Sequence, residues 1–195
     1  IISTGSKNLQ DQLFSRDLPA IKKALHYSGK IALLKGRSNY LCLERLDQVI
    51  AQGVLGDKSV LADLSKVRKW NNATKTGDLT ECIELAEDSP ILPQLTSTAE
   101  SCLGTDCPNY AECYVAQARK KALNADLVVV NHHLFFADMA VKESGFGELI
   151  PNAEVIIFDE AHQLPDIASQ YFGQSLTSRQ LFDLCKDINI VYRTE

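Results

Sequence analysis

A short apolar run, Val155-Ile156-Ile157-Phe158, is followed at once by Asp159-Glu160-Ala161-His162. This junction constrains the fold most, because branched and aromatic residues in a run of strand length predict a strand buried on both faces of a parallel sheet. In open α/β sheets, ligands bind beyond the carboxyl ends of such strands, and the two carboxylates fall there.

The chemistry of these four residues favours a nucleotide-coupled site. An Asp at this position can hold Mg²⁺ bridged to nucleotide phosphates, and the adjacent Glu can orient or deprotonate an attacking water. His162, one turn on, can couple the phosphate state to a neighbouring segment. The alternative is a strand followed by an acidic helix N-terminus, where Asp and Glu also suit the helix dipole. The strand before the pair and the Ala-His after it favour the first interpretation.

The rest of the chain alternates between strand-like and helix-like patterns. Strands are predicted at Ile1–Thr4, Ile31–Leu34 and Leu127–Val130. Helical spacing covers residues 40–51, 59–69, 108–124 and 178–190. This alternation predicts an α/β fold, a parallel sheet with helices on both faces, interrupted by a poorly periodic and mainly helical insertion between about 37 and 115.

The composition is that of an ordinary globular protein, with 45% hydrophobic and 23% charged residues. No apolar run approaches membrane-spanning length and no export signal opens the chain, so we expect a cytoplasmic protein with no membrane contact. The net charge of −5 argues mildly against a protein that coats nucleic acid. The chain begins without Met and stops inside a helical pattern, so we expect it to be a piece of a larger protein.

Six cysteines without an export signal indicate reduced thiols or metal ligands rather than disulfides. They are Cys42, Cys82, Cys102, Cys107, Cys113 and Cys185. Structural zinc sites commonly pair ligands with two residues between them, and that spacing is absent. Gaps of four and five residues from Cys102 to Cys113, with Cys42 far upstream, favour a [4Fe–4S] cluster on these four thiolates. The alternative of incidental thiols is favoured for Cys82 and Cys185.

Several motifs then make the chain resemble a known family. Ile1–Ser6 with Leu9–Leu13 looks like the first DNA-contacting motif of superfamily 2 helicases, and Lys35–Cys42 resembles the segment leading into the first cluster cysteine of iron–sulfur helicases. The cysteine triplet, Val130-Asn131-His132-His133 and the Asp159–His162 box follow in the family's order. The whole is similar to the bacterial DinG-type helicases, most of all to their YoaA branch, which are relatives of the eukaryotic XPD repair helicase.

The resemblance implies a domain organisation and an activity. It implies a partial RecA-like motor domain over residues 1–36 and 116–163, an iron–sulfur insertion over 37–115, and the start of a helical arch over 164–195. It implies an enzyme that unwinds DNA in the 5′-to-3′ direction with Mg²⁺ and ATP. The expected partners are single-stranded DNA, forked or damaged DNA and replication or repair proteins, and we expect a nucleoid-associated monomer.

The resemblance also assigns roles to residues. Asp159 would serve the Mg²⁺, Glu160 the hydrolytic water, and His162 the link between hydrolysis and movement. Ser3, Thr4 and Gly5 would lie near the single strand and contact phosphate through hydroxyl and backbone N–H groups. Arg37 and Tyr40 are weaker candidates for backbone pairing and base stacking.

One element of the family pattern is missing. The phosphate-binding pattern G-x-x-x-x-G-K-[ST] does not occur, since Gly29-Lys30 is followed by Ile31. We expect that loop upstream of Ile1, and the second motor domain is missing too, so the chain alone should be inactive. The alternative function is a non-catalytic metal-cluster module that binds nucleic acid or a protein partner. The carboxylate box argues against it, because such a module needs no hydrolytic Asp-Glu pair.

Overall fold

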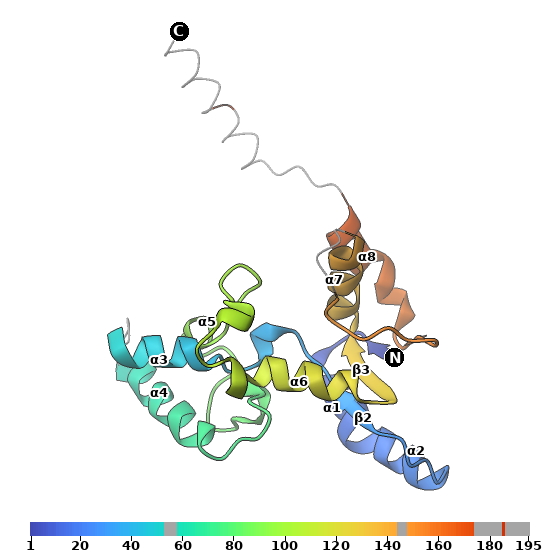
Figure 1. The fold of residues 1–195 in the computed structure, drawn as a ribbon, viewed down its shortest axis with the longest axis horizontal. Helices are drawn as coiled ribbons and strands as arrows, with labels where there is room; N and C mark the ends of the chain where they lie inside the picture. The colour runs from blue at the N-terminus through green and yellow to red at the C-terminus, as the bar shows by residue number, and fades with distance from the viewer. Residues whose placement is uncertain (53–57, 144–147, 174–184, 186–195) are drawn as a thin grey trace.

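The computed structural model describes residues 1–52, 58–143, 148–173 and 185 (Figure 1). Its sheet has four strands in the order β2-β3-β1-β4. They are β1 (Ile2–Thr4), β2 (Ile31–Leu33), β3 (Leu127–Asn131) and β4 (Ile157–Phe158). Every pairing is parallel, with Ile2 opposite both Val129 and Ile157. The predicted α/β fold is therefore confirmed, and its strands lie close to the predicted runs.

Helices cover both faces of this sheet. Side chains alternate along a strand, so Val128 and Val130 share one face, where they pack with Ala118 of α6 (Tyr114–Leu123) and Phe135 of α7 (His132–Glu143). Helix α8 (Leu164–Phe172) packs on α7 and joins the same core. Helix α1 (Lys7–Gln12) lies on the opposite face, where the buried Gln10 amide donates to the carbonyls of Leu34 and Val129.

Helices α1 and α2 (Leu18–Ala24) are joined by a π-helical turn, Leu13–Asp17, in one continuous run. Ser6 caps its start, because the hydroxyl accepts from the Leu9 N–H at 3.3 Å. The Leu18 N–H donates to the carbonyl of Leu13, five residues back. Pro19, which has no N–H to donate, follows directly, so the wider turn lets the helix continue past a residue that usually starts or breaks one.

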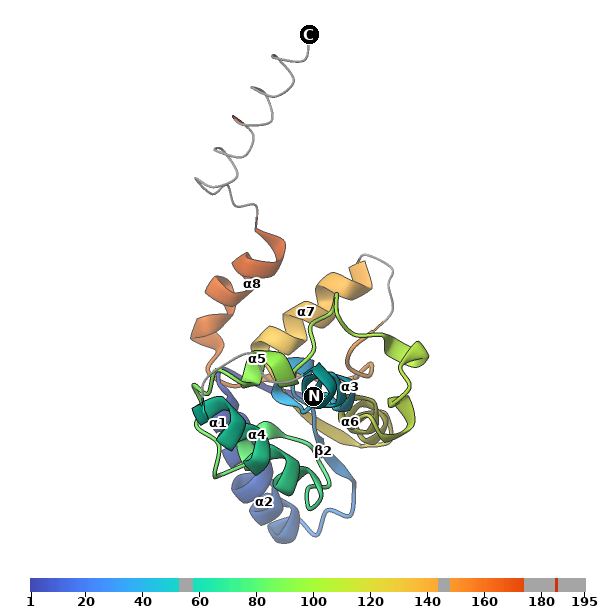
Figure 2. The same ribbon diagram turned by 90° about the vertical axis from the view of Figure 1, so that its left-hand side faces the viewer.

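A second hydrophobic core lies beside the sheet. It is built on α3 (Leu43–Gln52), α4 (Lys58–Asn71) and α5 (Leu92–Leu95), which gather on one side of the molecule in Figure 1 and face the viewer in Figure 2. Its fully buried members include Val67, Ile91 and Leu95. Residues 71–105 have little regular structure, yet Ile91 and Leu95 anchor them in this core. The described residues therefore form two hydrophobic cores, and the prediction of an inserted unit stays a prediction.

Buried contacts join the two cores. Lys35, which follows β2, is fully buried and forms ion pairs of 2.7 Å with Asp11 of α1 and with Asp78 of the insertion. Tyr114 packs against both cores. Gly77 has φ +65°, and a Cβ there would lie 2.1 Å from the Tyr114 ring, so this position requires glycine for conformation and for space.

Three expectations need correction or stay open. The prediction that Val155–Phe158 is buried on both faces is wrong: β4 covers only two of these residues and lies at the edge of the sheet, and Ile157 is 54% exposed. The helix predicted from 108 begins at Tyr114, because Cys113 is still extended and short 3-10 turns precede it. The helix predicted over 178–190 lies outside the described ranges, apart from residue 185. Within those ranges, no helix has the length and apolar character needed to cross a membrane.

Candidate functional site

The carboxyl edge of the sheet brings together three segments that are far apart in the sequence. Strand β1 delivers Ser3, β3 ends just before His132, and β4 delivers Asp159. The Ser3 hydroxyl lies 2.7 Å from His132 Nδ1, and His132 Nε2 lies 2.8 Å from the Asp159 carbonyl oxygen. The Asp159 N–H donates to the Ser3 carbonyl at 2.9 Å. These three contacts form a closed ring, the Ser3–His132–Asp159 ring.

Sequence reasoning noted His132 within a motif but assigned it no role. It is completely buried as the first residue of α7, and burial lowers its pKa although the Asp159 carbonyl favours the charged form. Asn131 begins the helix by accepting the Leu134 N–H at 2.8 Å. The available signal was a histidine directly after a buried parallel strand that ends at the same edge as β1 and β4.

The side chains of the predicted catalytic residues lie on the exposed side of the ring. Asp159 is exposed, and its Oδ1 accepts the Glu160 N–H at 3.0 Å. Glu160 has φ 55°, a left-handed conformation that is costly for a residue other than glycine and occurs most often at functional sites. The exposed His162 places Nε2 3.4 Å from Glu160 Oε2. Both carboxylates can therefore reach a ligand at this edge, and Asp159 is the residue that could hold a divalent cation.

The predicted DNA-contacting segment is mostly buried. Ser3 and Thr4 are fully buried, and the Thr4 hydroxyl donates to the Ser6 carbonyl at 3.2 Å. With the Ser3 hydroxyl directed at His132, neither hydroxyl is available to a phosphate in this conformation. Gly5 is partly exposed, and the Gln163 side chain lies against it, because a Cβ on Gly5 would be 2.6 Å from Gln163 Oε1. The backbone at Gly5 remains the candidate contact.

The four cysteines predicted as ligands line one cavity of about 800 Å³. They are Cys42, Cys102, Cys107 and Cys113. Burial raises the pKa of the Cys42 thiol, and the nearby Cys107 and Cys113 raise it further. No three His, Cys, Asp or Glu side chains in the described ranges converge on a single metal ion. Thiols spaced around a cavity suit a larger cluster better than one ion.

The surroundings of this cavity are positively charged. Arg37 and Arg119 both line it, and burial together with Arg37 lowers the pKa of Arg119, while Cys102 and Cys113 raise it. Two neighbouring guanidinium groups favour an anionic occupant, and an iron–sulfur cluster with four thiolate ligands is an anion. Cys82 is buried in the second core, and neither Cys82 nor Cys185 lines this cavity.

The two weaker DNA candidates differ. Arg37 is half-buried, and its Nη1 donates to the Thr98 carbonyl at 3.4 Å, a contact that a stronger acceptor could replace. Tyr40 is only 4% exposed, its hydroxyl accepts the Lys35 N–H at 3.1 Å, and burial raises its pKa to about 12. Its ring offers no free face for a base in this conformation, so the structure does not support the stacking role.

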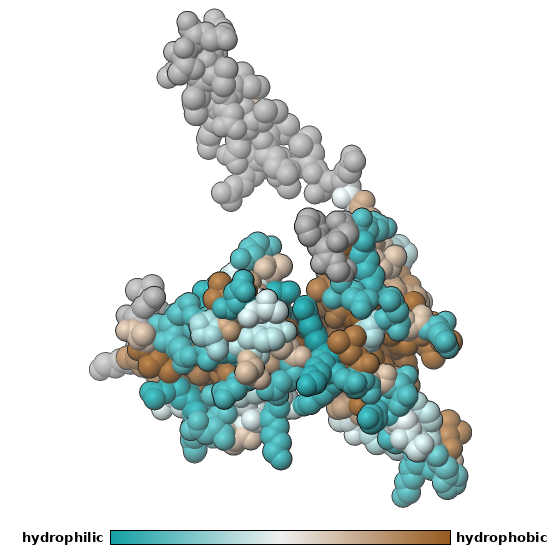
Figure 3. Space-filling model, in the orientation of Figure 1, coloured by the Kyte–Doolittle hydropathy of each residue, from teal (hydrophilic) through white to brown (hydrophobic). Residues whose placement is uncertain are grey.

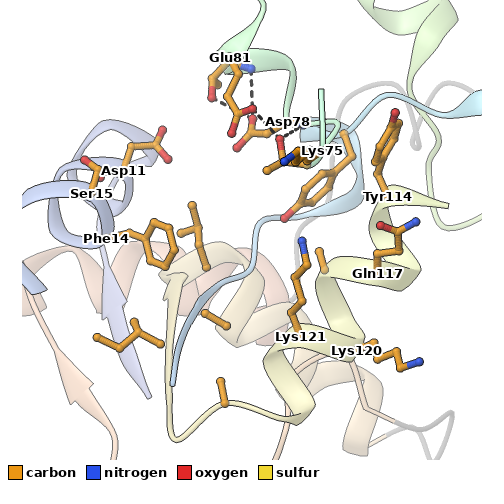
Figure 4. Close-up of a pocket in the computed structure, with 18 of the residues that line it drawn as sticks. Asp11, Phe14, Ser15, Lys75, Asp78, Glu81, Tyr114, Gln117, Lys120 and Lys121 are labelled. Carbon is orange, nitrogen blue, oxygen red and sulfur yellow. Dashed lines mark hydrogen bonds between the residues drawn. The ribbon is translucent and has the colours of Figure 1, made fainter. Parts of the chain in front are cut away.

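A second cavity, of about 1080 Å³, lies between α1, β2, α6 and the 75–81 loop (Figure 4). Asp11, Asp78 and Glu81 contribute negative charge, Lys75 lies beside Asp78, and Lys120 and Lys121 contribute positive charge from α6 on the other side (Figure 4). Phe14 and Tyr114 supply aromatic walls. Because its charges are mixed, this cavity does not select an anion, and of the predicted site residues only Tyr40 lines it.

Comparison with known proteins shows the family to which the chain belongs. The DEAD_2 family model matches residues 20–181, most of the chain, and the chain belongs to that family. It is 94% identical over 195 residues to a Haemophilus influenzae protein named ATP-dependent DNA helicase YoaA, and 67% identical to the Escherichia coli protein of that name. It is 34% identical over 93% of its length to ATP-dependent helicase DinG of Mycobacterium tuberculosis. The resemblance to DinG-type helicases is confirmed, and the chain spans about 30% of the length of these relatives.

Proposed function

We propose that this chain is part of the first motor domain of an ATP-dependent 5′-to-3′ DNA helicase that acts in DNA repair or replication. One observation carries the proposal: the Asp159–His162 box and the Ser3–Gly5 segment meet at one edge of a parallel sheet and are joined by direct hydrogen bonds. A motor that converts hydrolysis into movement needs its nucleotide site and its DNA site on connected elements. The names of the relatives support the same function.

In this proposal the two carboxylates divide the hydrolytic work. Asp159 would hold the Mg²⁺, which would neutralise phosphate charge, and the exposure of Asp159 at the strand end supports that role. Glu160 would orient the attacking water and accept its proton, and its left-handed backbone supports a functional position. His162 lies beside Glu160 and links its state to the segment that enters α8.

The cysteine cavity is proposed to hold a [4Fe–4S] cluster. Cys42, Cys102, Cys107 and Cys113 would be its ligands, within an insertion over residues 37–115. The shared cavity and the arginines beside it support this assignment. The cluster would join the 101–113 loops to the start of α3. Among the described residues, no helix or strand connects these two parts directly.

The proposed substrate is single-stranded DNA, as part of forked or damaged DNA. Arg37 and the Gly5 backbone would contact its phosphates without reading sequence. We propose a monomer in the cytoplasm, associated with the nucleoid, with replication or repair proteins as partners.

The test is ATP hydrolysis by the intact parent protein with and without single-stranded DNA. Asp159→Asn and Glu160→Gln should each lower the DNA-stimulated rate by about 10²–10⁴-fold while DNA binding persists. Asp166→Asn, an exposed carboxylate in the first turn of α8, is the matched control and should keep the wild-type rate. Robust DNA-stimulated turnover by either site variant would refute the catalytic assignment. The isolated chain, which has no phosphate-binding pattern, should not hydrolyse ATP above background.

A further inference from the structure

The Ser3–His132–Asp159 ring contains a histidine whose buried position no catalytic role explains. His132 touches neither of the two proposed catalytic side chains, because its partner on Asp159 is the backbone carbonyl. It follows β3, which pairs with β1, and its two ring nitrogens contact both the segment proposed to contact DNA and the box proposed to act on ATP. A residue in that position is suited to hold the two relative to each other.

The hydrogen-bonding chemistry fixes the state of the ring. A carbonyl oxygen can only accept, so His132 Nε2 must carry a proton to form its 2.8 Å contact with Asp159. In the neutral imidazole, Nδ1 is then the acceptor, and the Ser3 hydroxyl donates to it at 2.7 Å. Both nitrogens are used, and neither Ser3 nor His132 has any exposed surface.

A displacement of His132 would reach Glu160 through the backbone of Asp159. The carbonyl that His132 holds belongs to Asp159, and the Asp159 carboxylate in turn accepts the Glu160 N–H at 3.0 Å. Glu160 keeps a left-handed conformation only while its surroundings impose it. A shift of Ser3 would disturb its bond to His132, then the Asp159 carbonyl, and then the direction of Glu160.

We propose that His132 is a positioning residue that couples DNA binding at the Ser3–Gly5 segment to the orientation of Asp159 and Glu160. This rests on the proposed function. When DNA contacts the Gly5 backbone, β1 shifts, and the Ser3–His132–Asp159 ring transmits that shift to the hydrolytic carboxylate. His132 does not touch ATP or DNA.

The test separates the two bonds of the ring. A glutamine amide can mimic Nε2 and an asparagine amide can mimic Nδ1, so His132→Gln keeps the Asp159 contact and His132→Asn keeps the Ser3 contact. The readout, in the intact parent protein, is the ratio of ATP hydrolysis at saturating single-stranded DNA to hydrolysis without it. Each variant should lower this ratio about tenfold, a coupling loss of about 1.4 kcal/mol. The neighbouring exposed His133→Gln is the control and should keep the wild-type ratio.

A second substitution distinguishes a loss of coupling from misfolding and from a purely structural role of His132. Ser3→Ala removes only the donor to Nδ1, and it should lower the ratio as His132→Gln does. The double variant should be no worse than either single variant, because both break one bond. If the losses of the two single variants add up in the double variant, or if the variants lower the melting temperature but keep the ratio, the coupling role of His132 is refuted. The proposed function would not be affected by either result. A wild-type protein whose ATP hydrolysis does not respond to DNA would overturn the proposed function as well.

Discussion

Replacing Lys35 with methionine should unfold the junction between the two cores. The Lys35 side chain has no exposed surface, and its Nζ lies 2.7 Å from carboxylates on Asp11 and Asp78 and 3.2 Å from the Thr80 hydroxyl. Methionine fills a similar space without charge. The Asp78 side chain, which is 7% exposed, would then be left as a buried charge without its cation.

The expected loss follows from the burial of each partner. Removing one member of a buried ion pair typically costs about 3–5 kcal/mol, because the remaining charge stays desolvated. The Asp11 side chain is 36% exposed, so Asp11→Asn should cost only about 0–1 kcal/mol. The double variant Lys35→Met/Asp78→Asn should recover part of the loss, since it removes the uncompensated charge as well.

Tryptophan fluorescence during urea unfolding is a direct assay. Trp70 is the single tryptophan of the chain and packs against the second core, so its emission follows the insertion and not the sheet. The Lys35→Met variant should show a lower midpoint, and Asp11→Asn should stay close to the wild type. The reasoning fails if the two variants lose equal stability, or if the double variant is less stable than Lys35→Met.

Three other predictions concern the cluster, DNA binding and pH. After anaerobic reconstitution, iron and sulfide analysis should find a cluster lost in Cys42→Ser and kept in Cys82→Ser, and the reverse result would refute the ligand assignment. Arg37→Ala should weaken single-strand binding equally across sequences and reduce its salt dependence, as filter binding at several salt concentrations can measure. Replacing the exposed Arg68 of α4 with alanine should change neither. Burial lowers the pKa of His132 below its usual 6.5, so around that pH the unfolded state binds more protons than the folded state. The contribution of the neutral His132 to the free energy of unfolding is therefore fully present above pH 6.5 and is lost as the pH falls below 6.5. Urea unfolding at pH 7.5 and 5.5 should therefore show a flatter pH dependence for His132→Gln than for the wild type, and equal slopes would contradict the assignment.

The sequence was sufficient for the features that depend on local pattern. Apolar runs of strand length followed by polar residues predicted a parallel sheet with its site at the carboxyl edge, and Asp159 is found there. The four cysteines predicted as ligands from their spacing line one cavity, and Cys82 lies apart in the second core; their role as ligands stays a prediction.

Features that depend on contacts between distant segments were missed. The burial of Lys35 was not predicted, because nothing local indicates that carboxylates from α1 and from the 75–81 loop enclose it. The two contacts of His132 exist only because β1, β3 and β4 end in register, and the sequence alone does not show that register. The run at 155–158 has the composition of a central strand, and composition does not tell a central strand from an edge strand.

Strand β4 has a practical consequence for handling the chain in solution. Among the described residues it pairs only with β1, so its other side presents unsatisfied backbone donors and acceptors next to exposed Val155, Ile156 and Ile157. Figure 3 shows hydrophobic surface on the side of the molecule where the N-terminus, α7 and α8 lie. An open apolar edge is a template for strand pairing between molecules. The isolated chain should therefore self-associate as its concentration rises, and a short apolar peptide added in excess should compete by occupying the same edge.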